Sequence, residues 1–243
     1  GINLGAWYTG GNLNTAKQQA AGCGTQTSAL SFGGGVDPGG TLTAKTETYN
    51  GTSWAEVNDL NTARRYISGA GADNTSALAF SGFSPPSTNF ANTELWNGYT
   101  WTEVNDLNTN RGLLASSGVS NTSGLIFGGD TPGSTAVTES WNGSSWTEVN
   151  DLNKVIQVQG GLGTQTAALS FGGSPTTSQT EQWNGTNWTV VESMNVSLAY
   201  ANGAGTTTAG LGFSGSNPSG KLTTTEEWDG TGFITKTITT TTD

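Results

Sequence analysis

The stretch Glu139-Ser140-Trp141-Asn142-Gly143-Ser144-Ser145-Trp146 recurs, with small changes, along most of the 243-residue chain. Four further copies read ETYNGTSW from residue 47, ELWNGYTW from 94, EQWNGTNW from 181 and EEWDGTGF from 226. The first aromatic residues of successive copies lie 47, 45, 42 and 45 residues apart. This period is typical of four-stranded propeller blades, so the chain is a repeat protein.

Each copy predicts a tight hairpin. Asn-Gly and Asp-Gly readily adopt the positive φ angles that two-residue hairpin turns demand. The aromatic residues on either side stand where cross-strand partners meet, so they define the register of the two strands.

The remainder of each repeat predicts two more strands. One is rich in Gly, Ala and Ser and suits a crowded propeller axis, and the next is apolar and ends in Phe before Gly-Gly or Ser-Gly. We therefore predict an all-β, five-bladed propeller with four antiparallel strands per blade. Its five units span approximately residues 13–59, 60–106, 107–151, 152–193 and 194–236.

The two ends compete for one strand position. Trp7 lies 47 residues before Trp54, so residues 1–12 form an extra outer strand, over 4–10, or a lead-in. Residues 233–238 also occupy the outer-strand position of the fifth unit, and we favour these to complete that blade. We expect a closed domain, since an unclosed ring exposes sheet edges, and the sequence leaves open whether the five blades close alone or with a partner chain. A Thr-rich tail follows over 237–243. The start at Gly1 leaves two origins open, a processed start or a piece of a longer polypeptide.

Composition excludes several classes of function. Eight basic and 18 acidic residues give a net charge of −10, which repels a phosphate backbone and argues against nucleic acid as a partner. Histidine is absent and Cys23 is the only cysteine, so no disulfide can form within the chain and we expect no metal or cofactor. Without a run of 18 apolar residues or a signal peptide, we expect no membrane insertion.

The repeat resembles the kelch family over about residues 13–236. The resemblance is carried by Phe127-Gly128-Gly129 together with Trp141 and Trp146, and by Phe32-Gly33-Gly34 together with Tyr49 and Trp54. Arg64 and Arg111, at the entrance to the small-residue strand, also look like the kelch pattern. The amino-acid sequence of copies such as residues 141–152 also resembles repeats in predicted structural and fibre proteins of marine bacteriophages. That second resemblance implies a virion or extracellular location, with other virion or appendage proteins as partners.

Two sets of repeated acids invite a metal-site interpretation. A ring of ligands is conceivable at the glutamates of each copy, or at Asp59, Asp106 and Asp151 for calcium. A residue present once per blade usually serves the blade, and Asx residues hold turns through their own backbone. We favour the structural interpretation for both sets.

Four basic residues stand near the start of an innermost strand: Lys17, Arg64, Arg111 and Lys154. We predict them at one mouth of the axial channel, where they either attract an anionic ligand or pair with nearby carboxylates. The second alternative is the favoured one.

Aromatic residues divide into repeated and unrepeated ones. The repeated ones resemble platforms for sugar rings, but packing between blades explains them better: Trp54, Trp101, Trp146, Trp188, Trp96, Trp141, Trp183 and Trp228. Tyr8, Phe83, Phe90 and Tyr99 break the pattern and are our candidates for ligand binding. Asp130 joins them, because it opens one of the loops between second and third strands that vary in length and content: 36–45, 83–92, 130–137, 174–179 and 216–224.

Catalysis has little support in the residues. There is no Ser-His-Asp set and no phosphate-cradling loop, and the copper chemistry known on kelch-like propellers uses histidine, which this chain lacks. We expect a non-catalytic module of a virion fibre or spike that binds a host-surface glycan or a neighbouring structural protein. The alternatives are a secreted or cell-surface lectin-like adhesin and, remotely, a polysaccharide-acting enzyme with two carboxylates about 5 to 10 Å apart.

Overall fold

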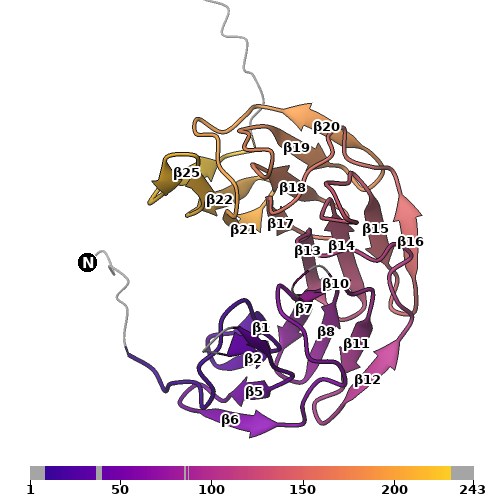
Figure 1. Ribbon diagram of the computed structural model, residues 1–243, viewed down its shortest axis with the longest axis vertical. Coiled ribbons are helices and arrows are strands. Elements are labelled where there is room, and N and C mark those ends of the chain that lie inside the picture. Colours follow the sequence, from indigo (N-terminus) through magenta and orange to yellow (C-terminus); the bar gives the residue numbers. More distant parts are fainter. Residues whose placement is uncertain (1–8, 37–39, 85, 87, 231–243) are drawn as a thin grey trace, which may run out of the picture.

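The computed structural model describes residues 9–36, 40–84, 86 and 88–230 of the chain. Within these ranges it contains β-strands and turns, and no helix that could span a membrane. Most of the strands form five antiparallel sheets of three or four strands, which follow one another around a common axis as the blades of a propeller (Figure 1). The predicted all-β fold with five blades is confirmed.

Four blades have the predicted four strands, and their sheet order follows the sequence from the axis to the rim. In the first two blades they are β1 (Ala21–Thr25), β2 (Ser28–Phe32), β5 (Thr46–Tyr49) and β6 (Trp54–Val57), then β7 (Ser68–Asp73), β8 (Ser76–Phe80), β11 (Thr93–Trp96) and β12 (Trp101–Val104). In the next two they are β13 (Ala115–Ser120), β14 (Ser123–Phe127), β15 (Thr138–Trp141) and β16 (Trp146–Val149), then β17 (Gly160–Gly163), β18 (Ala168–Phe171), β19 (Thr180–Trp183) and β20 (Trp188–Val191).

The fifth blade contains β21 (Asn202–Thr206), β22 (Ala209–Phe213) and β25 (Thr225–Trp228). Its predicted outer strand, 233–238, lies outside the described residues, as do most of the alternative strand over 4–10 and the tail over 237–243. Short hairpins project from three loops: β3 (Gly35–Val36) with β4 (Thr41–Leu42), β9 (Phe83–Ser84) with β10 (Thr88–Asn89), and β23 (Ser216–Asn217) with β24 (Gly220–Lys221).

The Asn-Gly turns have the predicted chemistry. Gly98 adopts a φ of +93°, and the Asn97 side-chain oxygen accepts the backbone N–H groups of Tyr99 and Thr100 at 2.9 Å each. Trp96 and Trp101 are direct cross-strand partners whose ring centroids lie 5.3 Å apart. The turn and the aromatic pair therefore set the register of the two outer strands together.

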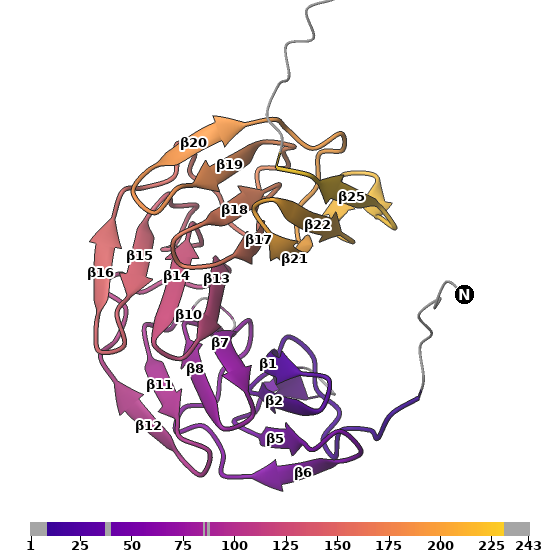
Figure 2. The same ribbon diagram turned by 180° about the vertical axis from the view of Figure 1, so that it is seen from behind.

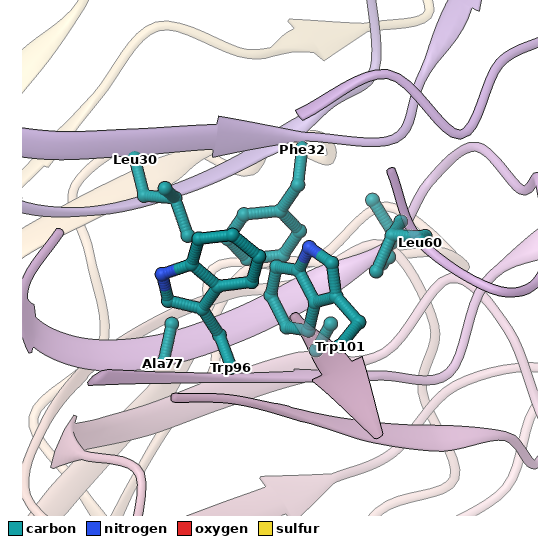
Figure 3. Packing of buried hydrophobic residues seen from close by; sticks show 8 residues of the cluster. Leu30, Phe32, Leu60, Ala77, Trp96 and Trp101 are labelled. Atoms are coloured by element: carbon teal, nitrogen blue, oxygen red, sulfur yellow. The ribbon is translucent and has the colours of Figure 1, made fainter. Parts of the chain in front are cut away.

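The core lies between neighbouring blades. Leu30 and Phe32 project from β2 of the first blade toward Trp96 and Trp101 of the second blade (Figure 3). All four side chains are at most 5% exposed. The interface buries apolar side chains from both sheets, which is the main favourable contribution to the stability of such stacked repeats.

The ring of blades is not closed. In both views the arc is open between β1 and the fifth blade, where β22 and β25 lie (Figures 1 and 2). The described residues alone therefore do not form the expected closed domain, and the terminal segments predicted to close it lie mostly outside them. Because the packing of each blade on the next sets a fixed rotation, five blades of this shape cover only part of a circle.

Candidate binding site at the axial mouth

Five residues with unusual backbone geometry surround one end of the propeller axis. Each stands just before an innermost strand, one in each blade, with φ between +50° and +58°: Gln19, Tyr66, Leu113, Val158 and Tyr200. This left-handed region is unfavourable for side chains larger than glycine, and especially for β-branched valine. Such outliers concentrate at functional sites, because the surrounding structure must impose them.

Hydrogen bonds between blades impose this geometry. The backbone N–H of Tyr66 donates to the Gln19 carbonyl at 3.0 Å, and that of Val158 donates to the Leu113 carbonyl at 2.8 Å. Tyr200 in turn donates to the Val158 carbonyl at 2.8 Å. Main-chain hydrogen bonds of the rim thus link the first blade to the second, the third to the fourth and the fourth to the fifth.

The rim encloses a hollow of about 250 Å³. Besides the five residues of the rim it is lined by the aliphatic residues Ile67 and Leu114 and by small and polar residues, including Ser68, Gln159 and Asn202. Tyr200 is 57% exposed beside it. The site therefore combines aromatic surface with neutral hydrogen-bonding groups.

Two residues that line this hollow each have a buried side-chain amide oxygen without a hydrogen-bond partner. Gln159 is 5% exposed, and its side-chain N–H₂ donates to the Phe127 carbonyl at 2.8 Å, which leaves its Oε1 unpaired. Gln19 donates to the Tyr66 hydroxyl at 2.7 Å, and its Oε1 is likewise unpaired. A buried acceptor without a donor costs about 1–3 kcal/mol. Both oxygens are enclosed by protein atoms, so a ligand in the hollow reaches them only after these side chains turn toward it.

An aromatic and cationic group adjoins the rim. The Tyr66 and Phe83 rings meet edge to face with centroids 6.1 Å apart. The Arg65 guanidinium carbon lies 5.7 Å from the centre of the Tyr66 ring, and one of its terminal nitrogens donates to the Gly40 carbonyl at 3.2 Å. The Gly40 carbonyl of the first blade and the Phe83 ring of the second blade thereby hold Arg65 and Tyr66 in place.

The variable loops lie on the same face as the rim. In each blade the residue before the rim position pairs with the beginning of the loop that follows the second strand: Gln18 with Gly35, Arg65 with Phe83, Gly112 with Asp130, Gln157 with Ser174 and Ala199 with Ser216. The axial mouth and the loops thus form one surface.

The residues predicted to bind a ligand do not all lie at the axial mouth. Phe83 lies beside the rim, and Phe90 is half-buried at the end of the same loop. Asp130 opens the next loop, where its carboxylate accepts hydrogen bonds from Gly133 N–H and from the Asn89 side chain. Tyr99 is 79% exposed but lies at the opposite end of β11 from Phe83, and Tyr8 lies outside the described residues.

The four predicted basic residues do not line the channel mouth. Arg64 and Arg111 follow the favoured alternative, which is pairing with carboxylates. Arg64 and Arg111 are fully buried and form ion pairs with Glu94 at 2.5 Å and with Glu139 at 3.1 Å. Burial lowers the pKa of both guanidinium groups, and the paired carboxylates oppose that shift.

The two lysines are also absent from the residues that line the mouth. Lys17 is half-buried and donates to the carbonyls of Ser31 and Lys45. Burial lowers the pKa of its ammonium group, which Glu47 opposes. Lys154 is half-buried beside a small hollow that Ile156 and Glu181 also line.

The repeated acids serve the scaffold. Glu94 accepts the backbone N–H and the side-chain amide of Asn61, at 2.7 and 2.9 Å, and thus holds the linker that enters its blade. Asp106 accepts the backbone N–H of Thr93 at 3.2 Å. Among the described residues no three acidic or cysteine side chains form a cluster that could hold a metal ion.

A second hollow, of about 240 Å³, lies between the fourth and fifth blades and is lined by Phe171, Thr180 and Trp228. In the preceding interfaces the corresponding space is filled by the outer-strand tryptophan, as Trp188 packs on Phe127. Phe233 has this position in the fifth repeat and lies outside the described residues. The hollow is therefore a packing position of the scaffold rather than a candidate ligand site.

Sequence reasoning missed most of the axial site. One sequence signal could have found it. The side chains just before the small-residue strands differ from repeat to repeat, and they include Gln19, Tyr66, Gln159 and Tyr200. Phe83 was selected because it breaks the repeat pattern, and these residues break it as well. Their convergence on the axis, however, depends on how the blades pack.

A scan against protein-family models and a search of curated proteins both found no match. Among solved structures, that of YjhT is similar to this chain, with a TM-score of 0.71 and 12% sequence identity. The similarity covers 86% of this chain and 80% of that chain. At this level of identity the likeness shows the propeller fold alone.

Proposed function

We propose that this chain is a non-catalytic, kelch-like module of a virion fibre, spike or other extracellular appendage, and that it attaches to a neutral host-surface glycan through the axial mouth. The observation that carries the proposal is the hollow of about 250 Å³, which exposed Tyr200 lines together with the polar residues Ser68 and Asn202. The resemblance of the repeat sequences to those of phage fibre proteins supports the location in a virion. Binding to a neighbouring structural protein instead of a glycan is an outcome of the test below.

The chemistry of the mouth suits a sugar. A pyranose ring has apolar C–H faces that stack on aromatic side chains, and its hydroxyl groups donate hydrogen bonds to amide oxygens. Gln19 and Gln159 carry such oxygens, which become available to a sugar when these side chains turn toward the hollow, and Tyr66 and Tyr200 supply aromatic surface. The residues that line the mouth carry no charge, so a neutral sugar fits it better than an anionic one.

A glycan array with the full chain tests the proposal, followed by titration of the best-binding glycan. We expect Tyr200→Asn to weaken binding by about tenfold or more, which corresponds to about 1.4 kcal/mol. Asparagine tolerates the left-handed backbone of this position, so the variant removes the ring without adding strain. Gln19→Leu, which removes an unpaired acceptor and its N–H₂ donor, should weaken binding as well.

Tyr99→Asn is the matched control, since it removes an exposed tyrosine at the far end of a strand. It should leave affinity unchanged. Equal losses for Tyr99→Asn and Tyr200→Asn would contradict the axial site. Absence of glycan binding by the folded chain would overturn the glycan proposal and favour contact with a neighbouring structural protein.

A further inference from the structure

Every interface between consecutive blades has two complementary halves. One blade contributes a leucine and a phenylalanine from its second strand, as Leu30 and Phe32 do. The following blade contributes the paired aromatic residues of its outer strands, as Trp96 and Trp101 do. The same contact recurs where Phe80 meets Trp146 at 5.2 Å and Phe127 meets Trp188 at 4.8 Å.

The fifth blade presents the first half of this interface without a partner among the described residues. Leu211 is 39% exposed and Phe213 is half-buried. The residues at the position of Leu211 in the other blades are at most 1% exposed: Leu30, Leu78, Leu125 and Leu169. The face of β22 is therefore built for contact but lies on the edge of the opening (Figure 1).

The first blade presents the second half. Tyr49 and Trp54 pair with ring centroids 5.0 Å apart, yet both remain half-buried. Their counterparts in the second blade, Trp96 and Trp101, are 1% and 5% exposed. The opening is thus bounded on one side by a leucine and phenylalanine face that lacks an aromatic pair. On the other side it is bounded by an aromatic pair that lacks a leucine and phenylalanine face.

We propose that the opening receives one further blade of the same repeat pattern, which closes the propeller. Its leucine and phenylalanine would pack on Tyr49 and Trp54, and its aromatic pair would pack on Leu211 and Phe213. A sheet of this pattern carries the two halves on its opposite faces, as the second, third and fourth blades do, so a single unit satisfies both walls at once.

A second copy of the chain does not fit the opening. If its first blade entered there, its remaining blades would curve around the same axis and collide with the first blade of the original copy (Figures 1 and 2). The occupant is therefore a single blade and not another arc.

The path of the chain before the first blade is consistent with such a unit. Asn58 donates to the Tyr99 carbonyl at 2.7 Å, so the segment that leaves one blade runs past the turn of the next. Gly11 has the repeat position of Asn58 and lies against Thr52 in the turn of the first blade, where an added Cβ would come within 2.6 Å of the carbonyl oxygen.

Trp7 precedes Trp54 by 47 residues, the interval that also separates Trp54 from Trp101. Trp7 itself lies outside the described residues. Before its outer strand, the additional blade needs three strands: a small-residue strand, an apolar strand of the type at 123–129, and a strand of the type at 138–141.

The test extends the full chain at its C-terminus with a copy of residues 107–141, in a Cys23→Ser, Leu211→Cys background. The thiol at position 211 then reports on the face of β22. We expect its alkylation to be at least about tenfold slower in the extended chain, since reaction requires an exposed thiolate. The matched control carries the same extension with serine in place of its copied Leu125, Phe127 and Trp141, and should react as fast as the unextended chain.

Three results would overturn the proposal. Equal reactivity in the extended and control chains would show that the extension does not pack on the fifth blade. Slow reaction in the unextended chain at low protein concentration would show that the fifth blade is covered in another way. Protection that rises with protein concentration, together with a dimer mass by light scattering, would assign the face to a second copy.

Discussion

Phe32 and Trp101 place their ring centroids 4.9 Å apart across the interface between the first and second blades, and the Trp101 indole N–H donates to the Thr46 hydroxyl oxygen at 3.0 Å. One residue thus supplies both the apolar surface and the polar bond that join two blades. Trp146 and Trp188 make the corresponding bonds to Thr93 and Thr138. Buried indole N–H groups generally need such an acceptor.

This arrangement predicts a graded response at Trp101. Trp101→Phe keeps a ring but leaves the Thr46 hydroxyl without its donor, so the free energy of unfolding should fall by about 1–3 kcal/mol. Trp101→Ala should cost about 3–5 kcal/mol through the cavity it creates. Urea denaturation measures both, with Trp54→Ala as the control, because Trp54 borders the opening and is only half-buried. Equal losses for alanine at 54 and 101 would contradict the assigned interface.

The buried ion pair of Arg64 with Glu94 predicts a rescue experiment. Arg64→Ile should destabilise the chain by about 3–5 kcal/mol, since it leaves a buried carboxylate without its charge partner. The fourth blade has Ile156 at this position, and its glutamate, Glu181, instead accepts the Gln179 side-chain N–H₂ at 3.1 Å.

Asn92 has the repeat position of Gln179, so Arg64→Ile with Asn92→Gln should recover part of the lost stability. Asn92→Gln alone is the control, and the coupling between the two changes follows from a double-mutant cycle. A coupling of zero would show that the glutamine of the fourth blade does not replace the arginine.

Cys23 should be unreactive in the folded chain. Burial raises the pKa of its thiol to about 12, and the charge of Asp73 adds to this shift. At pH 8 the thiol is then protonated, and the thiolate is the reactive form. Iodoacetamide should modify Cys23 slowly in the native chain and rapidly in urea, as followed by mass spectrometry. Rapid modification without denaturant would contradict the packing of β1.

Stability should fall in acid. Burial disfavours the Glu47 carboxylate, but the N–H groups of Asn14 and Thr15 that bond to it outweigh this effect and lower its pKa below the ordinary 4.5. A group with a depressed folded pKa stabilises the fold above its unfolded pKa, and the benefit is lost as pH falls through the folded value. Melting temperatures measured between pH 7 and pH 3 should therefore drop below about pH 4.5.

Glu47→Gln should reduce the slope of this decline, because the variant has no carboxyl to protonate at that position. Asp73, whose pKa is lowered by hydrogen bonds from the Thr75 hydroxyl and backbone N–H, acts in the same direction and is left intact in the variant. An unchanged slope in Glu47→Gln would assign the acid sensitivity to other groups.

The sequence by itself determined the repeat unit, the number of blades and the register of each outer hairpin. These features depend on contacts close in sequence: the turn at Asn97 and Gly98, and the pairing of Trp96 with Trp101. It also indicated the structural role of the glutamates, since a residue repeated once per blade serves the blade.

Only the tertiary structure decided where the charges and the axial residues lie. Arg64 and Tyr66 are two positions apart, yet one is enclosed with Glu94 and the other lines the axial hollow. Whether five blades close a ring depends on the rotation between them, which arises from packing between segments more than 40 residues apart, such as Phe32 on Trp101. No local pattern encodes that rotation, so the burial of Arg64, the axial mouth and the opening between Trp54 and Leu211 emerge only when the blades are assembled.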